Sequence, residues 1–168
     1  ITDVVRQVLL PIWNAYSFFT LYANVDGYRA EMRTDSTRLL DRYLLAKTRT
    51  LIESVTRHMD AYDLPGATAE IQGFTDALNN WYIRRSRRRF WKSEQDQDKR
   101  DAYDTLYTVL HVLCRAVAPL LPYLTEEVYR GLTGEDSVHL ADWPDLEALP
   151  EDPELVRDMD RVRDACSQ

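Results

Sequence analysis

Apolar residues recur at every third or fourth position along most of the chain, which is the spacing of a buried helical face. The periodic segments are separated by short polar turns, and the whole sequence contains only five glycines. This pattern predicts an all-α bundle of four to five long helices, with a short extended segment at Ser137–Leu140 and a C-terminal helix. The helices are expected at about 4–23, 37–62, 65–92, 99–118, 125–134 and 154–166.

Hydroxyl and carboxylate side chains mark where several of these helices should begin. Thr2-Asp3 precedes the first helix, Asp35-Ser36-Thr37 the second, Asp63 the third and Thr125 the fifth. A side-chain oxygen at such a position accepts a hydrogen bond from a free backbone N–H of the first helical turn. We therefore predict an N-cap at each of these four places.

Prolines and glycines predict where helices bend or end. Pro11 falls inside the first helix and should kink or break it, because proline lacks the N–H that an interior helical position donates. Pro119 and Pro122 should end the fourth helix for the same reason. Gly131 or Gly134 should end the fifth helix, since glycine adopts the left-handed conformation of a C-cap.

The sequence predicts two parts of unequal size. Residues 1–144 are expected to form one helical domain, and residues 145–168 a linker followed by the start of a junction to other parts of a protein. The stretch from Asp145 to Pro153 is acidic and contains prolines, and the helix after it is expected to pack loosely or against a missing segment. Because the sequence begins with Ile1 and ends within a helical pattern, we expect it to be a piece of a longer protein.

Composition restricts the classes of protein that this sequence can represent. The chain has 168 residues, 45% of them hydrophobic and 29% charged, which is the composition of a globular protein with a sizeable core. No apolar run approaches the roughly 18 residues of a membrane span, so no membrane partner is expected. The two cysteines, Cys114 and Cys166, form no metal-binding or disulfide pattern, which suits a reducing cytoplasm.

No catalytic or metal-ligating pattern is visible. The sequence lacks phosphate-binding glycine loops, a nucleophile elbow and a zinc-protease motif. The three histidines, His58, His111 and His139, are far apart, and Cys114 lies among apolar neighbours as a small core residue does. Neighbouring carboxylates at Glu126-Glu127 do not face each other on a helix, so stabilisation of a first turn is expected of them. We expect no catalytic residue, cofactor or metal in this chain.

One stretch departs from the acidic character of the chain. The sequence has 21 Lys+Arg against 28 Asp+Glu, a formal charge of −7, yet six cations and no carboxylate lie between Ala77 and Ser93. Four aromatic side chains are interleaved with these cations. Guanidinium groups pair with phosphate oxygens, and indole rings stack on unpaired bases. The stretch therefore predicts a site for structured RNA with a loop.

Helical phase divides this stretch into faces. At 100° per residue, one face of the third helix carries two aromatics and two cations: Trp81, Arg84, Arg88 and Trp91. Two further residues fall at the border of this face: Asn80 and Arg87. Three cations continue the core side instead, where a structural role is equally open to them: Arg85, Arg89 and Lys92.

Two alternatives remain open at this point. The arginines can pair with carboxylates of this acidic chain while the aromatics fill the core, in which case the stretch is structural. Alternatively, the chain is a helical protein-interaction module whose arginine-rich strip binds an acidic partner. Binding to RNA and binding to an acidic protein are separable by competition.

Residues 80–91, NWYIRRSRRRFW, resemble a signature of the anticodon-binding domain of isoleucyl-tRNA synthetases. Four other segments resemble the same family in the same order: 10–19, 41–46, 118–127 and 137–144. The valyl and leucyl enzymes share the helical domain, whereas the arginine-rich continuation after Trp81-Tyr82 points to isoleucine. The resemblance thus covers nearly the whole chain and implies a helical domain that binds the tRNA anticodon stem-loop.

The same resemblance implies what lies outside this sequence. Members of the family charge tRNA with isoleucine using ATP and magnesium, and their ATP-handling motifs of the H-I-G-H and K-M-S-K-S kind do not occur here. We therefore expect a cytoplasmic parent enzyme, a catalytic domain of the same chain as partner, and no catalysis by this part alone. Contact with isoleucine-accepting tRNA is predicted for eight residues: Asn80, Trp81, Arg84, Arg85, Arg87, Arg88, Trp91 and Lys92.

Overall fold

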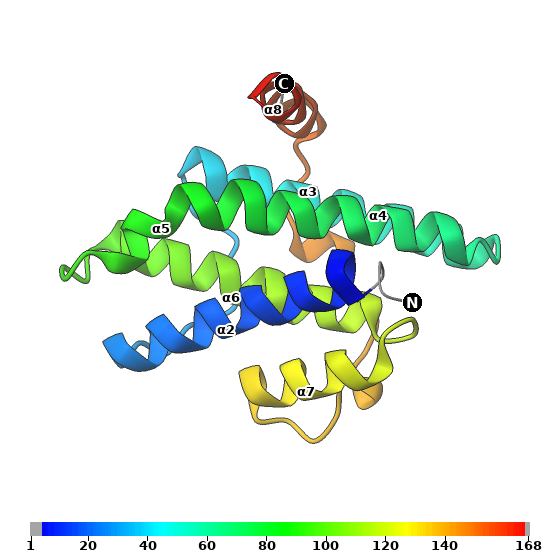
Figure 1. The fold of residues 1–168 in the computed structure, drawn as a ribbon, viewed down its shortest axis with the longest axis horizontal. Helices are drawn as coiled ribbons and strands as arrows, with labels where there is room; N and C mark the ends of the chain where they lie inside the picture. The colour runs from blue at the N-terminus through cyan, green and yellow to red at the C-terminus, as the bar shows by residue number, and fades with distance from the viewer. Residues whose placement is uncertain (1–4, 167–168) are drawn as a thin grey trace.

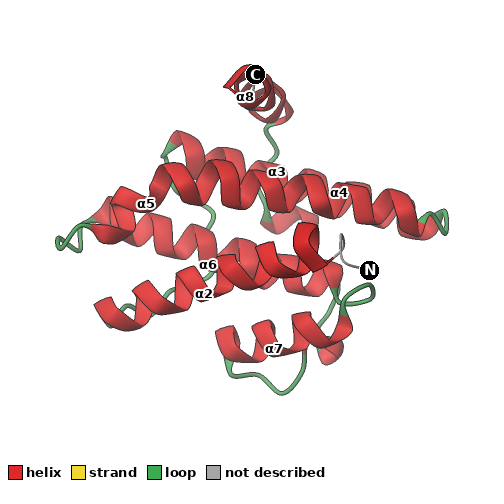
Figure 2. Ribbon diagram, in the orientation of Figure 1, coloured by secondary structure: helices red, strands yellow, loops and turns green. Residues whose placement is uncertain are grey.

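The computed structural model describes residues 5–166, and within this range it contains helices and loops but no strand (Figures 1 and 2). The prediction of an all-α fold is confirmed. The α-helices are α2 (Leu10–Asp26), α3 (Leu39–Asp60), α4 (Leu64–Asp76), α5 (Arg84–Trp91), α6 (Gln97–Val117), α7 (Pro122–Thr133) and α8 (Pro153–Cys166). Two π-helical segments, η1 (Val5–Leu9) and η2 (Ala77–Ile83), and two short 3-10 helices, η3 (Val138–Leu140) and η4 (Leu146–Ala148), complete the described part.

The helices are stacked in layers. The segments α4, η2 and α5 join without a break into one long helix, which lies beside α3 (Figure 1). Beneath this pair lie α2 and α6, and α7 packs below them. A single large core fills the space between the layers, with two tyrosines as its largest fully buried side chains: Tyr82 and Tyr103. A smaller core under α7 includes Tyr129. None of the helices within 5–166 is long and apolar enough to cross a membrane.

Several predicted helix ends are confirmed. The Asp63 carboxylate accepts a hydrogen bond from the Gly66 N–H at 3.0 Å, so Asp63 is the N-cap of α4. Pro119 and Pro122 follow the end of α6 at Val117. Gly134 closes α7 with a φ of 75°, a conformation that a side chain disfavours.

Two predicted N-caps are wrong. The residue before α3 is Arg38, and no side chain caps this helix. The Ser36 hydroxyl instead donates to the Asp41 carboxylate at 2.7 Å and accepts from the Arg38 N–H at 3.3 Å, so it reaches no N–H of the first helical turn. Helix α7 begins at Pro122, which fits a first turn because no N–H is needed there. Thr125 therefore lies inside this turn and donates to the Leu121 carbonyl at 2.8 Å.

The first helix is not broken at Pro11. The π-helical segment η1 runs directly into α2, and Pro11 lies in the first turn of α2. Pro11 has no N–H to donate to the Gln7 carbonyl four residues earlier, and that carbonyl accepts from the Thr75 hydroxyl at 3.3 Å instead. Pro11 thus marks a change of helix type. The predicted cap at Thr2-Asp3 lies outside the described residues.

The predicted extended segment at residues 137–140 is also wrong, because Val138–Leu140 forms a 3-10 turn. Its geometry is fixed by hydrogen bonds that residue periodicity does not reveal. The Ser137 hydroxyl accepts from the His139 N–H at 3.1 Å and donates to the Glu126 carboxylate at 3.0 Å. Glu126 also accepts from the Val138 N–H at 2.9 Å, which ties the turn to α7.

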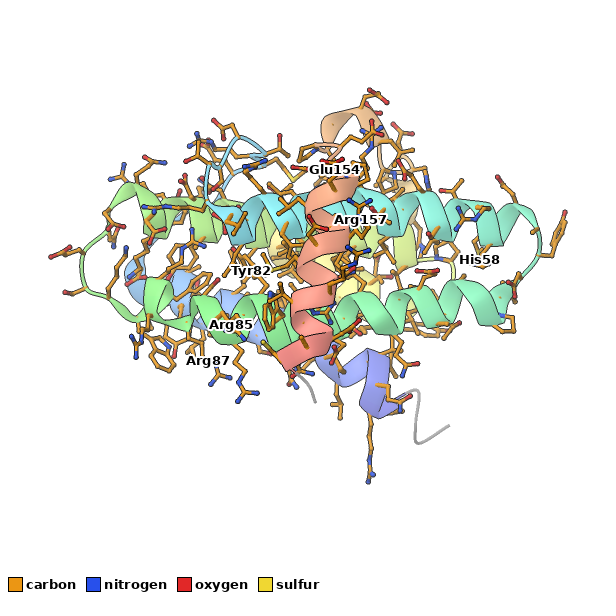
Figure 3. The ribbon with its side chains drawn as sticks, turned by 90° about the horizontal axis from the view of Figure 1, so that it is seen from above. His58, Tyr82, Arg85, Arg87, Glu154 and Arg157 are labelled. Carbon is orange, nitrogen blue, oxygen red and sulfur yellow. The ribbon has the colours of Figure 1, made fainter. Side chains whose placement is uncertain are left out.

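The segment expected to be a linker lies against the bundle. Leu149 is buried in the main core, and Arg49 of α3 donates to the carbonyls of Leu146 and Leu149 at 2.6 and 3.0 Å. Helix α8 then crosses α3 and α4 (Figure 3), as its contacts with Lys47 and Asp76 require. The division of the chain at residue 144 stays a prediction.

Acid should weaken the packing of α7 through His111. This half-buried imidazole lies 5.2 Å from the Tyr129 ring, and its buried Nδ1 has no hydrogen-bond partner. Burial, together with nearby Arg115, lowers the pKa of His111 to about 4. The neutral imidazole is therefore favoured in the folded state, and its contribution to stability is lost as the pH falls from about 6.5 towards 4. Urea denaturation at several pH values should show this loss, and the His111→Gln variant should show less of it.

Candidate nucleic-acid interface

Helix α5 presents most of its arginines on the side that faces away from the bundle. Its buried side is formed by Ser86 and Phe90, and the Phe90 ring lies 5.0 Å from the rings of Phe18 and Tyr103. Figure 3 shows Arg87 on the outer side of α5, away from α3. Four of the exposed residues follow the three-and-four spacing of a single helical face: Arg84, Arg87, Arg88 and Trp91. Arg85 is exposed too, at the edge of this face.

Arg89 holds this helix to α3. Its guanidinium donates to both carboxylate oxygens of the fully buried Asp41, at 2.6 and 2.8 Å, and it lies 2.9 Å from Asp98. The Tyr82 hydroxyl donates to the same Asp41 carboxylate at 2.8 Å. Burial opposes the charge on Arg89, but the hydrogen bonds to Asp41 prevail and raise the pKa of Arg89 above its usual range. Arg89 is thus a structural residue, one of the two roles that the sequence left open for it.

Four neighbouring arginines have no such partner. Within the described part of the chain, no carboxylate lies within ion-pair distance of Arg84, Arg85, Arg87 or Arg88. At 1.5 Å per residue these four cations occupy about 6 Å of helix axis, so their mutual repulsion is uncompensated. Pairing with a carboxylate of the chain, as the structural alternative requires, is therefore seen for Arg89 and not for the other four. We call the set of Arg84, Arg85, Arg87 and Arg88 the arginine face.

The two tryptophans are not brought to one face. Trp81 is buried, with 8% of its surface exposed, and the guanidinium of Arg85 stacks on its ring at 3.6 Å from the centroid. Trp91 is 56% exposed, and its Nε1 donates to the Tyr22 hydroxyl of α2 at 2.7 Å. The predicted face was therefore wrong at Trp81. The π-helical segment η2 accounts for the error. A π-helical turn holds more residues than an α-helical turn, so it changes which side of the helix each later residue faces.

The remaining residues predicted to contact RNA differ in whether their polar groups are already paired within the chain. Lys92 is half-buried, and its ammonium lies 2.7 Å from Asp96 and 3.0 Å from Asp98, so its charge is neutralised. Asn80 is exposed and donates to Asp76 at 2.6 Å. A hollow in the surface, lined by Asn80, Arg84, Arg85 and Trp81 together with Cys166 of α8, lies beside the arginine face.

Tyr22 was missed by the sequence analysis. It belongs to a different helix, 69 residues away from Trp91, and nothing in its local sequence marks it. Its hydroxyl fixes the edge of the exposed indole, which leaves the flat face of Trp91 open for stacking. The surface therefore combines free guanidinium groups with one oriented aromatic ring.

Other candidate groups fall outside this surface. Burial raises the pKa of the Cys114 thiol to about 12, so it remains protonated at neutral pH. His58 lies 2.8 Å from Asp63, the residue that caps α4. Among residues 5–166, no group of three or more histidine, cysteine or acidic side chains is placed to hold a metal ion.

Comparison with known proteins assigns the chain to a family. A family model described as the anticodon-binding domain of tRNA ligase matches residues 41–167. The chain is similar to isoleucine--tRNA ligases from Leifsonia xyli subsp. xyli (55% identity, 97% of this chain), Mycobacterium tuberculosis strain H37Rv (54%, 99%) and Wolbachia pipientis wMel (49%, 99%). It spans 15% of the length of each of these relatives. The family predicted from the residue motifs is confirmed, and the chain belongs to the anticodon-binding domains of tRNA ligases.

Proposed function

We propose that this chain binds the anticodon stem-loop of an isoleucine-accepting tRNA. The observation that carries the proposal is the arginine face: four exposed guanidinium groups without carboxylate partners beside the exposed ring of Trp91. The guanidinium groups can each donate two hydrogen bonds to a phosphate of the stem, and an unpaired loop base can stack on the indole ring. The similarity to isoleucine--tRNA ligases supports isoleucine as the amino acid of the tRNA.

Charge distribution confines RNA to this part of the molecule. Six of the 21 basic residues lie between Ala77 and Ser93, where no acid occurs, while all 28 acidic residues lie elsewhere. A polyanion is therefore repelled by most of the surface and attracted to α5. This arrangement orients the bound RNA as well as holding it.

The whole protein that contains such a chain is proposed to be an isoleucine--tRNA ligase. In this proposal, a catalytic domain of the same protein attaches isoleucine to tRNA with ATP and magnesium in the cytoplasm, and the present chain holds the anticodon end. The chain spans 15% of its relatives' length, which leaves ample room for such a domain in those proteins.

Binding of a synthetic anticodon stem-loop should be strongly dependent on salt. With four phosphate contacts, log affinity should fall with log salt concentration at a slope of about −2.8 to −3.6, from roughly −0.7 to −0.9 per contact. Fluorescence titration of the 168-residue chain across salt concentrations measures this slope. A slope near zero would sink the proposal.

The same titration tests the protein-interaction alternative. A duplex RNA of equal length should bind more weakly than the stem-loop, because its bases are not free to stack on Trp91. Polyglutamate should compete poorly at equal charge. If polyglutamate displaced the stem-loop as well as tRNA does, the arginine face would be a docking site for acidic proteins.

A further inference from the structure

A polar groove lies next to the arginine face. One wall is formed by η1 and the start of α2, and the other by α4 and η2. The groove has a volume of about 320 Å³, at the lower end of the roughly 300–1,000 Å³ that sites for small ligands occupy. Its walls are rich in carboxamide side chains: Gln7, Asn14, Gln72, Asn79 and Asn80.

These carboxamides leave several hydrogen-bonding groups free. Gln72 donates through Nε2 to Oε1 of Gln7 at 3.0 Å, which leaves the Gln7 amino group and the Gln72 oxygen without a partner. Asn79 donates to the carbonyls of Pro11 and Thr75, and its own side-chain oxygen accepts nothing. The groove therefore offers both donors and acceptors, as the edge of a nucleobase requires.

Asn14 is the least constrained of the five. Its side chain is exposed, and among the described residues it makes no hydrogen bond. An amide without a partner inside a groove presents an adjacent donor and acceptor, the pair that a base edge can bind with two hydrogen bonds.

The charge of the groove suits a neutral group better than a phosphate. Arg6 and Asp76 both line the groove, so its formal charges cancel, whereas the arginine face concentrates four cations and is the stronger site for a phosphate. The Asp76 carboxylate itself is occupied, because Asn80 donates to one oxygen at 2.6 Å and Arg163 of α8 lies 2.9 Å from the other. A neutral base placed in the groove would contact carboxamide groups and a carboxylate whose two oxygens already have partners.

The groove continues into the arginine face through one residue. Asn80 lines the groove and also the hollow that contains Arg84 and Arg85. One helical turn separates Asn80 from Arg84, roughly 6 Å along the axis. A nucleic-acid strand whose phosphates lie on the arginines can therefore reach the groove with a neighbouring base.

We infer that the groove is a nucleobase subsite, in which Asn14, Gln7 and Gln72 bind the edge of one unpaired loop base of the RNA held by the arginine face. This inference rests on the proposed function and adds to it a place where sequence is read. Arginines contribute attraction that is independent of sequence, whereas the amides distinguish one base from another.

The test combines protein variants with RNA from which single bases have been removed. Asn14→Ala should weaken binding of the anticodon stem-loop about fivefold to tenfold, the effect of one or two hydrogen bonds, without changing the salt slope. Removing the base that occupies the groove should cause a similar loss, and Asn14→Ala should cause no further loss with that RNA. Gln72→Ala repeats the test from the opposite wall. Gln97→Ala, an exposed amide outside the groove, is the matched control and should bind as the unchanged chain does.

The outcomes separate this inference from the proposed function. If the unchanged chain shows no salt-dependent binding, the proposed function fails and the base subsite falls with it. If the chain binds normally but Asn14→Ala and Gln72→Ala have no effect, only the subsite is wrong. The subsite is also wrong if Asn14→Ala lowers the salt slope, because the residue then contacts phosphate, or if its effect adds to that of every base removal.

Discussion

Replacing Arg89 with methionine should lower the free energy of unfolding by about 3–5 kcal/mol. Methionine keeps much of the length of the side chain, but the fully buried Asp41 carboxylate loses both guanidinium hydrogen bonds. The Tyr82 and Ser36 hydroxyls still donate to Asp41, yet neither compensates a buried negative charge. Urea denaturation followed by circular dichroism measures the change.

The neighbouring arginine supplies the matched control. Arg88→Met removes the same charge from the same helix, but Arg88 is exposed and has no carboxylate partner. Its effect on stability should stay within about 0.5 kcal/mol. In the double variant Asp41→Asn with Arg89→Met, the loss should be smaller than the sum of the two single losses, because no charge is then left buried alone. Equal stability of Arg89→Met and Arg88→Met would show that the ion pair does not anchor α5.

Local sequence signals predicted the helices well because most of their apolar faces are buried within the chain. The stripe of the third helix, with Ala67, Ile71, Phe74 and Leu78, is buried as its spacing indicated. The cap at Asp63 was also predictable, since donor and acceptor lie only three residues apart. Interactions between sequence neighbours are thus readable from the sequence.

The phase of α5 was not readable in this way. A projection at 100° per residue assumes an unbroken α-helix, and the π-helical segment η2 violates this assumption just before the arginines. The result is that Trp81 turns inward while Tyr82 reaches Asp41 of α3. No residue within 77–83 is a proline or glycine that would have marked the irregularity.

The sequence could not predict which arginine pairs with Asp41, for a related reason. Arg89 and Asp41 are 48 residues apart, and the helical phase left a structural role equally open to Arg85 and Arg89. Only the packing of α5 on α3 decides which of them meets the carboxylate. The same packing leaves Arg87 and Arg88 facing outward. The fold therefore decides which arginines of the stretch are exposed to a ligand.

The double variant Arg87→Ala with Arg88→Ala should reduce affinity for the anticodon stem-loop about 100-fold at about 50 mM salt. Each lost phosphate contact removes about tenfold at this concentration and about 0.7–0.9 units of salt slope, so the slope should become shallower by about 1.5. Neither side chain is buried or paired, and the variant should therefore keep the helical circular dichroism of the parent chain.

Removing two arginines elsewhere distinguishes binding through contacts on α5 from attraction by the total charge of the protein. Arg57→Ala with Arg130→Ala takes two exposed arginines from α3 and α7, outside the arginine face. This control lowers the net charge equally, so a binding mode set only by total charge predicts equal losses for both double variants. A mode set by contacts on α5 predicts an almost unchanged salt slope for the control, because counterions are released only where phosphates are neutralised. Equal slopes for the two double variants would remove the arginine face from the binding site.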